Sequence, residues 1–168
     1  MEAIRLLKMD HNRVKQLFKR YEALGEKAEQ GKQELFETIQ AELDVHARIE
    51  EEIFYPAVKE ARTKVGQELV AEGIEEHLLI KRLLSELSRM KPADEQFDAK
   101  MTVLRELTVH HIGEEEEAHD GTFAIARTKI SRDRLMELGE LMEARKDALQ
   151  AGWIGAAQAW LKSLVPGM

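Results

Sequence analysis

The sequence predicts an all-α protein: an antiparallel, up-down four-helix bundle with additional C-terminal helices. Only three prolines occur in 168 residues, and the stretches between them are rich in Ala, Leu, Glu, Lys and Arg, which are strong helix formers. Apolar residues repeat at spacings of three and four rather than two, as they do on one face of an α-helix. The predicted helices also have similar lengths and short connections, which favours antiparallel neighbours.

Four predicted helices form the bundle, and each ends near a residue that interrupts helical structure. They cover residues 2–24, 33–58, 66–90 and 93–119. Gly25 ends the first helix, and Pro56 lies in the last turns of the second. Pro92 stops the third helix, and Asp120 with Gly121 breaks the fourth. Each helix has about 23 to 27 residues, which corresponds to a length of about 35 to 40 Å.

The C-terminal part of the chain is expected to add two helices, over residues 131–150 and 153–164. We therefore divide the chain into a bundle of residues 1–121 and a helical extension of residues 122–168 that packs on the bundle. The apolar residues of the extension can cover one end of the bundle, or they can pair with a second subunit in a homodimer. These residues are Leu135, Leu138, Leu141, Met142, Trp153, Ile154, Trp160, Leu161 and Leu164.

Charge and composition argue against several classes of function. Lys and Arg number 25 and Asp and Glu 32, and the resulting net charge of −7 argues against a nucleic-acid-binding surface, which needs a basic patch. No stretch approaches the roughly 20 apolar residues that span a membrane, and residues 1–10 lack the pattern of a secretory signal. The chain has no cysteine, which excludes Cys-ligated zinc and iron–sulfur clusters. We expect a cytoplasmic protein whose metal ligands, if it has any, are His and carboxylate side chains.

One histidine falls in the apolar stripe of each predicted bundle helix. These residues are His11, His46, His77 and His111. Counting from the predicted loops places all four at a similar height in an antiparallel bundle, within about one turn of 5.4 Å. Glu50 follows His46 by four residues, and therefore shares its inner face. Glu115 follows His111 at the same spacing, so the sequence predicts a layer of four His and two Glu side chains.

A metal site explains this layer better than an ordinary apolar core does. A single histidine on an apolar face is usually a core residue, but four at one level with two carboxylates are not expected by chance. Burying two carboxylates without a partner costs several kcal/mol each, and one or two divalent cations supply that partner. Imidazole and carboxylate ligands without thiolate suit iron, manganese or zinc, among which the spacing does not distinguish.

Neighbouring acidic and histidine residues are expected to lie outside the ligand set. His110 and Glu114 repeat the four-residue spacing. The helical phase nevertheless favours His111 and places His110 at the edge of the stripe, as a boundary or supporting residue. The acidic runs 50–52 and 114–117 otherwise belong to a solvated face. Glu42, one turn before His46, is near the inner face, and a supporting or surface role is favoured over that of a spare ligand. His119 is expected at the surface.

Four segments in this order resemble the hemerythrin-like, HHE cation-binding domain family. They are LLKMDH ending at His11, HARIEEEIFYP over residues 46–56, EEH ending at His77, and HHIGEEEE over residues 110–117. The resemblance spans about residues 4 to 120 and implies a four-helix bundle that holds a non-haem di-iron centre, with an oxo or hydroxo bridge or open sixth positions. The implied ligands are His11 and His46 on one iron, His77 and His111 on the other, and Glu50 and Glu115 as bridges.

Two positions depart from the pattern of the family. Oxygen-carrying hemerythrins have a further His one turn before the third-helix ligand, and this chain has Gly73 there. The resemblance then implies an open or water-filled position on one iron, which favours reaction with peroxide or NO over simple oxygen carriage. Relatives often repeat Phe-Pro after the second His-Glu motif, whereas this chain has Asp120 and Gly121 followed by Phe123, so the fourth helix is expected to end differently.

Three functions are compatible with this sequence. The first is a di-iron protein that binds O₂, NO or a related small ligand, for sensing, storage or the response to oxidative or nitrosative stress. The second is an enzyme that decomposes peroxide at the same centre, where the metal and its bound water would carry out the chemistry. The third is a bundle that stores a metal ion or uses it as a structural element.

Overall fold

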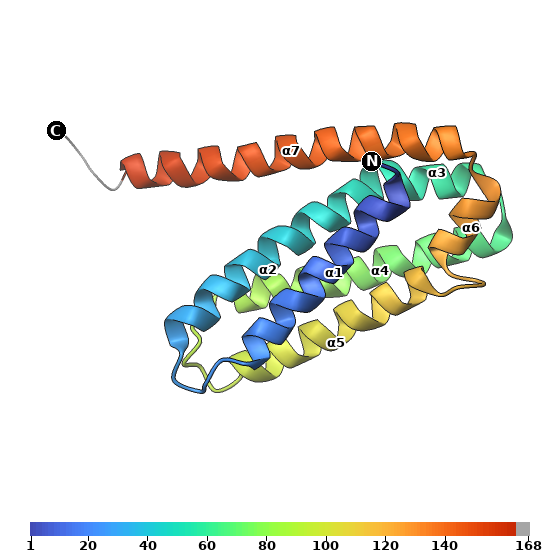
Figure 1. The fold of residues 1–168 in the computed structure, drawn as a ribbon. Coiled ribbons are helices and arrows are strands. Elements are labelled where there is room, and N and C mark those ends of the chain that lie inside the picture. The colour runs from blue at the N-terminus through green and yellow to red at the C-terminus, as the bar shows by residue number, and fades with distance from the viewer. Residues whose placement is uncertain (164–168) are drawn as a thin grey trace.

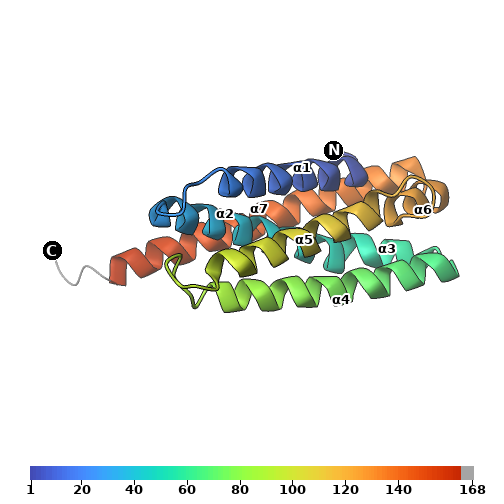
Figure 2. The same cartoon turned by 90° about the horizontal axis from the view of Figure 1, so that it is seen from below.

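The structure, a computed structural model, describes the backbone of residues 1–163 and the side chains of residues 1–152. It confirms the all-α helical bundle. Helices α1 and α2 form one antiparallel pair and α4 and α5 form the other, as Figure 1 and Figure 2 show. Helix α7 lies outside the bundle along α1 and α2. In the described part of the chain, no helix has the length and apolar character needed to cross a membrane.

The helix boundaries differ from the predicted ones mainly at loops. The elements are α1 (Ala3–Glu22), α2 (Glu29–Ile49), η1 (Glu50–Phe54), α3 (Tyr55–Glu60), α4 (Lys64–Leu87), α5 (Phe97–Glu116), α6 (Thr122–Lys129) and α7 (Arg132–Ser163). Helix α5 ends at Glu116, three residues before the predicted end, and the short helix α6 was not predicted. The two predicted C-terminal helices are one continuous helix, α7.

A π-helical turn interrupts the second bundle helix. In this turn, η1, the backbone N–H of Tyr55 donates to the carbonyl oxygen of Glu50, five residues earlier. The following residue, Pro56, has no N–H to continue an α-helical ladder, which accounts for a local rearrangement of the helix at this point. The wider turn lets Glu50, Phe54 and Tyr55 all lie buried, at 0%, 0% and 2% exposure. The π turn therefore adds a tyrosine to the inner face that carries Glu50.

Two apolar clusters form the core, and the histidine layer lies between them. On α1, one cluster includes Ile4 and Leu7 and the other begins at Val14, with His11 between them in the sequence. On α4, Val70 belongs to the first cluster and Ile80 to the second, again on either side of the histidine. The polar layer is thus enclosed by apolar side chains above and below, and these shield it from water.

Helix α7 packs against the first cluster through three buried side chains, Leu135, Leu138 and Met142. Gly139 allows close approach, because a side-chain carbon there would overlap the carbonyl oxygen of Met1. Leu141 is 53% exposed and does not contribute to this contact. The remaining apolar residues considered for the extension have side chains outside the described part of the chain. They are Trp153, Ile154, Trp160, Leu161 and Leu164.

Candidate metal centre

The six candidate ligands come together in one buried layer. The α-helices α1, α2, α4 and α5 contribute one histidine each, η1 contributes Glu50, and α5 also contributes Glu115. None of the six is more than 5% exposed. They are His11, His46, Glu50, His77, His111 and Glu115. Each helix presents its residue inward because the apolar stripe on either side of it is buried.

The histidines form two pairs that face each other through their Nε2 atoms. The two Nε2 atoms are 3.1 Å apart in the pair of His11 and His46, and also 3.1 Å apart in the pair of His77 and His111. Ligand atoms about 2.1 Å from one shared cation lie about 3.0 to 3.4 Å from one another in octahedral or tetrahedral geometry. Both pairs therefore have the separation expected for two ligands of one cation.

Each glutamate lies between the two histidine pairs. Glu50 Oε2 is 3.3 Å from Nε2 of His46 and 3.3 Å from Nε2 of His77. Glu115 Oε2 is 3.3 Å from Nε2 of His11 and 3.7 Å from Nε2 of His111. Each carboxylate thus contacts one histidine from each pair, as a group bridging two cations would.

The chemistry of the layer fits bound cations. Both carboxylate oxygens of Glu50 and Oε2 of Glu115 are buried without a hydrogen-bond partner. Burial, and then the negative charge of Glu115, raises the pKa of Glu50 well above its usual value. Burial also disfavours ionised Glu115, but the imidazole of His11, 3.3 Å from Oε2, and the charge of His111 together lower its pKa. A cation between the carboxylates would supply the missing partners and remove their mutual repulsion.

Each histidine faces a second carboxylate through its other ring nitrogen, Nδ1. His11 Nδ1 donates to Glu116 at 2.7 Å, His77 Nδ1 to Glu51 at 2.9 Å, and His111 Nδ1 to Glu76 at 2.6 Å. His46 Nδ1 lies 3.7 Å from Asp10 Oδ2. A proton held on Nδ1 leaves the lone pair of Nε2 free for a metal ion.

We call these four residues, Asp10, Glu51, Glu76 and Glu116, the outer carboxylates. Their role was not predicted from the sequence, in which Glu51 and Glu116 were assigned to the solvated face. A usable signal exists, because each outer carboxylate is the sequence neighbour of a candidate ligand. The neighbouring pairs are Asp10 and His11, Glu50 and Glu51, Glu76 and His77, and Glu115 and Glu116.

The remaining residues considered in the sequence lie outside the layer. His110 has a side chain that is 61% exposed and lies near Glu114 and Glu76. Glu42 pairs with Arg13 at 2.6 Å. His119 is exposed in the loop after α5.

Residues 2–118 match the sequence model of the hemerythrin HHE cation binding domain. The chain belongs to this family. A crystal structure of a hemerythrin HHE cation binding domain-containing protein from Mycobacterium kansasii is similar, with a TM-score of 0.76 and 27% identity, over 94% of this chain and 93% of that one.

A curated relative from Nostoc sp. (strain PCC 7120 / SAG 25.82 / UTEX 2576) is named DNA nickase. It is 29% identical over 145 residues, which are 86% of this chain but 39% of the relative. Because the chain spans about two fifths of that protein's length, the activity in the name describes the longer protein.

Tyr55 lies next to Gly73, the position at which an additional histidine ligand is absent. Its hydroxyl oxygen is 2.8 Å from where a side-chain carbon of Gly73 would be. Its ring stacks on His77, with centroids 5.6 Å apart, and its hydroxyl donates to Glu115 Oε1 at 2.9 Å.

A small cavity lies on the histidine side of the layer and has a volume of about 10 Å³. All four histidines border it, with apolar neighbours such as Val14, Leu43 and Ile80. Thr108 also borders the cavity, and its hydroxyl group donates to the carbonyl oxygen of Leu104 at 2.8 Å. A volume near that of one water probe leaves room for a very small ligand.

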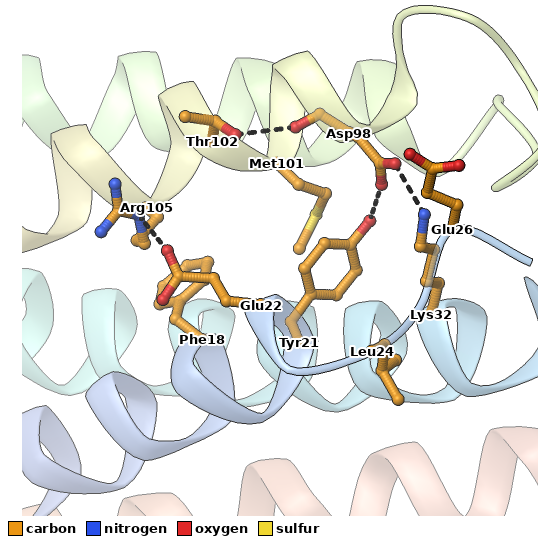
Figure 3. A pocket seen from close by; sticks show the side chains of 10 residues that line it. All are labelled: Phe18, Tyr21, Glu22, Leu24, Glu26, Lys32, Asp98, Met101, Thr102 and Arg105. Atoms are coloured by element: carbon orange, nitrogen blue, oxygen red, sulfur yellow. Dashed lines mark hydrogen bonds and ion pairs between the residues drawn. The ribbon is translucent and has the colours of Figure 1, made fainter. Parts of the chain in front are cut away.

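A larger hollow, of about 210 Å³, lies at the loop end of the bundle and is separate from the metal centre. Figure 3 shows Tyr21 and Lys32 both directed at the carboxylate of Asp98, each at 2.6 Å. Asp98 therefore ties the ends of α1, α2 and α5 together. No histidine lines this hollow.

Proposed function

We propose that this protein is a non-haem di-iron protein that binds O₂, NO or a related small ligand. The observation that carries the proposal is the layer itself, with two pairs of Nε2 atoms 3.1 Å apart and carboxylate oxygens buried without partners. In this proposal His11 and His46 would hold one iron, His77 and His111 would hold the other, and Glu50 and Glu115 would supply carboxylate ligands to both. Bound iron would supply a redox-active Lewis acid for the small ligand.

The chain's own residues account for selectivity by size. The cavity of about 10 Å³ is bordered by apolar side chains, which exclude bulk water and organic substrates. Tyr55 does not line this cavity, but its hydroxyl donates to Glu115 and holds that carboxylate in place. Such a pocket suits reversible binding of a diatomic ligand in sensing, storage or the response to oxidative or nitrosative stress.

Elemental analysis and absorption spectroscopy on the same purified sample test this function. We expect about two irons per chain, with charge-transfer bands that change on reduction and on addition of NO or O₂. A colourless protein holding one redox-inactive ion, or a folded protein with none after iron supplementation, would contradict the proposal and favour storage or a structural role.

Thr108 provides a test of the cavity. Thr108→Ala enlarges the space beside the histidines, and we expect tighter azide binding by about tenfold or less, with a loss of about 1 to 2 kcal/mol in unfolding free energy. Thr102→Ala is the matched control, because Thr102 makes the same bond to the carbonyl four residues earlier but is exposed on the outside. Equal azide affinity in wild type and both variants would show that azide does not bind in the cavity beside Thr108.

Decomposition of hydrogen peroxide at the same centre is the second candidate. One observation favours it: Tyr55 places a buried hydroxyl group beside Glu115, where it can orient an oxygen-containing substrate. Peroxide consumption that disappears in His77→Ala, and is strongly reduced in Tyr55→Phe with iron content retained, would support this activity. Equal consumption by wild type and His77→Ala would exclude it.

A further inference from the structure

Within residues 1–152, all but one of the four outer carboxylates form an ion pair with a lysine side chain. Three of these carboxylates pair with a lysine: Glu51 with Lys81 at 2.6 Å, Asp10 with Lys146, and Glu116 with Lys8 and Lys15 at 3.7 and 3.9 Å. Glu76 forms no ion pair with a lysine or arginine among the side chains that the structure describes. Its neighbours are His110 and Glu114 instead.

Glu76, His110 and Glu114 have the geometry of a ligand set. His110 Nε2 lies 3.2 Å from Glu114 Oε1 and 3.4 Å from Glu76 Oε1. Both distances match the edge of a coordination polyhedron around one cation, about 3.0 to 3.4 Å for bonds of about 2.1 Å. His110 and Glu114 are four residues apart on α5, and Glu76 comes from the neighbouring helix α4, so the backbone of two packed helices fixes the three side chains.

The charge of this cluster also favours a cation. Two carboxylates stand beside one imidazole, whereas each of the other three outer carboxylates has an ammonium group. A third acidic residue, Glu72, lies close enough for its charge to act on Glu114. A divalent ion would therefore supply the positive charge that lysine supplies at the other three positions.

We propose that Glu76, His110 and Glu114 form a second, solvent-facing site for a divalent cation. One imidazole nitrogen and two carboxylate oxygens suit manganese, ferrous iron or zinc, with water in the remaining positions. His110 is 61% exposed, so the ion exchanges directly with solvent, unlike an ion in the buried layer. Glu76 Oε2 accepts from His111 Nδ1 at 2.6 Å while Oε1 faces His110, so one carboxylate connects this surface site to the buried centre.

Titration of the as-purified 168-residue chain with Mn²⁺ tests the surface site, with free Mn²⁺ followed by electron paramagnetic resonance. We expect one exchangeable Mn²⁺ per chain in addition to tightly held metal. His110→Ala and Glu114→Gln should each weaken Mn²⁺ binding by about tenfold or more. His119→Ala is the control, because His119 is an exposed histidine outside the cluster.

The proposal would be overturned if wild type binds no exchangeable Mn²⁺ at millimolar concentration, or if His110→Ala binds as wild type does. Mn²⁺ entering a vacant buried layer gives a different result, since that binding would be lost in His77→Ala and retained in His110→Ala. Elemental analysis of the dialysed sample reports the buried metal separately, so failure of the surface site is distinguishable from failure of the di-iron proposal.

Discussion

The hydroxyl group of Tyr55 donates a hydrogen bond to Oε1 of Glu115 at 2.9 Å, which joins the π-helical turn after Glu50 to the end of α5. Both residues are 2% exposed. The bond occupies one oxygen of Glu115 and leaves Oε2 directed at the histidines. The same tyrosine fills the space above Gly73, so the π turn, the glycine and the carboxylate form one structural unit.

Gly73→Ala should destabilise the protein only while Tyr55 keeps its hydroxyl group. A side-chain carbon at position 73 would lie 2.8 Å from that oxygen, and the ring is held in place by stacking on His77. We expect Gly73→Ala to lower the unfolding free energy by about 1 to 3 kcal/mol in wild type. In the Tyr55→Phe background the same change should be close to neutral, because alanine is the better helix former. Denaturant unfolding of the four variants measures this coupling, and purely additive effects would contradict the contact.

Glu50→Gln should have opposite effects with and without bound metal. In metal-free protein the substitution replaces a buried, unpartnered carboxylate with a neutral amide. We therefore expect the Glu50→Gln variant to be as stable as wild type or more stable. In metal-loaded protein the same change removes a ligand. A loss of about 100-fold in metal affinity would reduce stabilisation by about 2.7 kcal/mol. Thermal unfolding before and after chelation, with metal content measured by elemental analysis, tests both signs. A fully loaded variant of unchanged stability would exclude Glu50 as a ligand.

The sequence was sufficient to place the six candidate ligands in one buried layer, because helical periodicity and loop positions are local information. His11 and His77 each lie in a stripe of apolar residues spaced three or four positions apart. The stripe residues before and after each histidine are buried in the structure. Equal helix lengths then place such residues at one height. The spacing of four residues also gives Glu50 and Glu115 their inward direction.

The rest required tertiary structure. A stripe analysis assumes a regular α-helix, so it did not predict the π turn that brings Tyr55 beside Gly73. It also assigns the neighbours of inward residues to the surface, since they are rotated by about 100°. Glu116 nevertheless reaches His11 because α1 lies beside α5, and this contact depends on helix packing rather than on local sequence.

Glu51 and Glu52 provide a matched test of the outer carboxylates, because they are adjacent and have different partners. Glu51 accepts from His77 Nδ1 at 2.9 Å, whereas Glu52 pairs with Arg145 on α7. We expect Glu51→Gln to weaken metal binding by about 10- to 100-fold, because the imidazole loses a charged acceptor that orients it. Glu52→Gln should leave metal affinity unchanged. Competition with a chelator measures both affinities, and equal losses in the two variants would indicate a general effect of lost charge.

The contact at the loop end predicts a pH-dependent stability. Burial disfavours ionised Asp98, but hydrogen bonds from Lys32 and Tyr21 outweigh it and lower the pKa of Asp98 below its usual value. Because the pKa of Asp98 is lowered in the folded state, its contacts with Lys32 and Tyr21 stabilise the protein fully above the unfolded-state pKa of about 3.9. This contribution is lost as the pH falls through the folded-state pKa.

Asp98→Asn should therefore be less stable than wild type at pH 7, and the difference should shrink steadily below about pH 4. Urea unfolding of metal-free protein between pH 3 and pH 7 measures the difference, since any pH effect on the histidine layer is common to both proteins. Glu95→Gln is the control, because Glu95 is an exposed acidic residue in the loop just before α5. A difference between wild type and Asp98→Asn that stays constant down to pH 3 would show that Asp98 contributes through packing rather than through its charge.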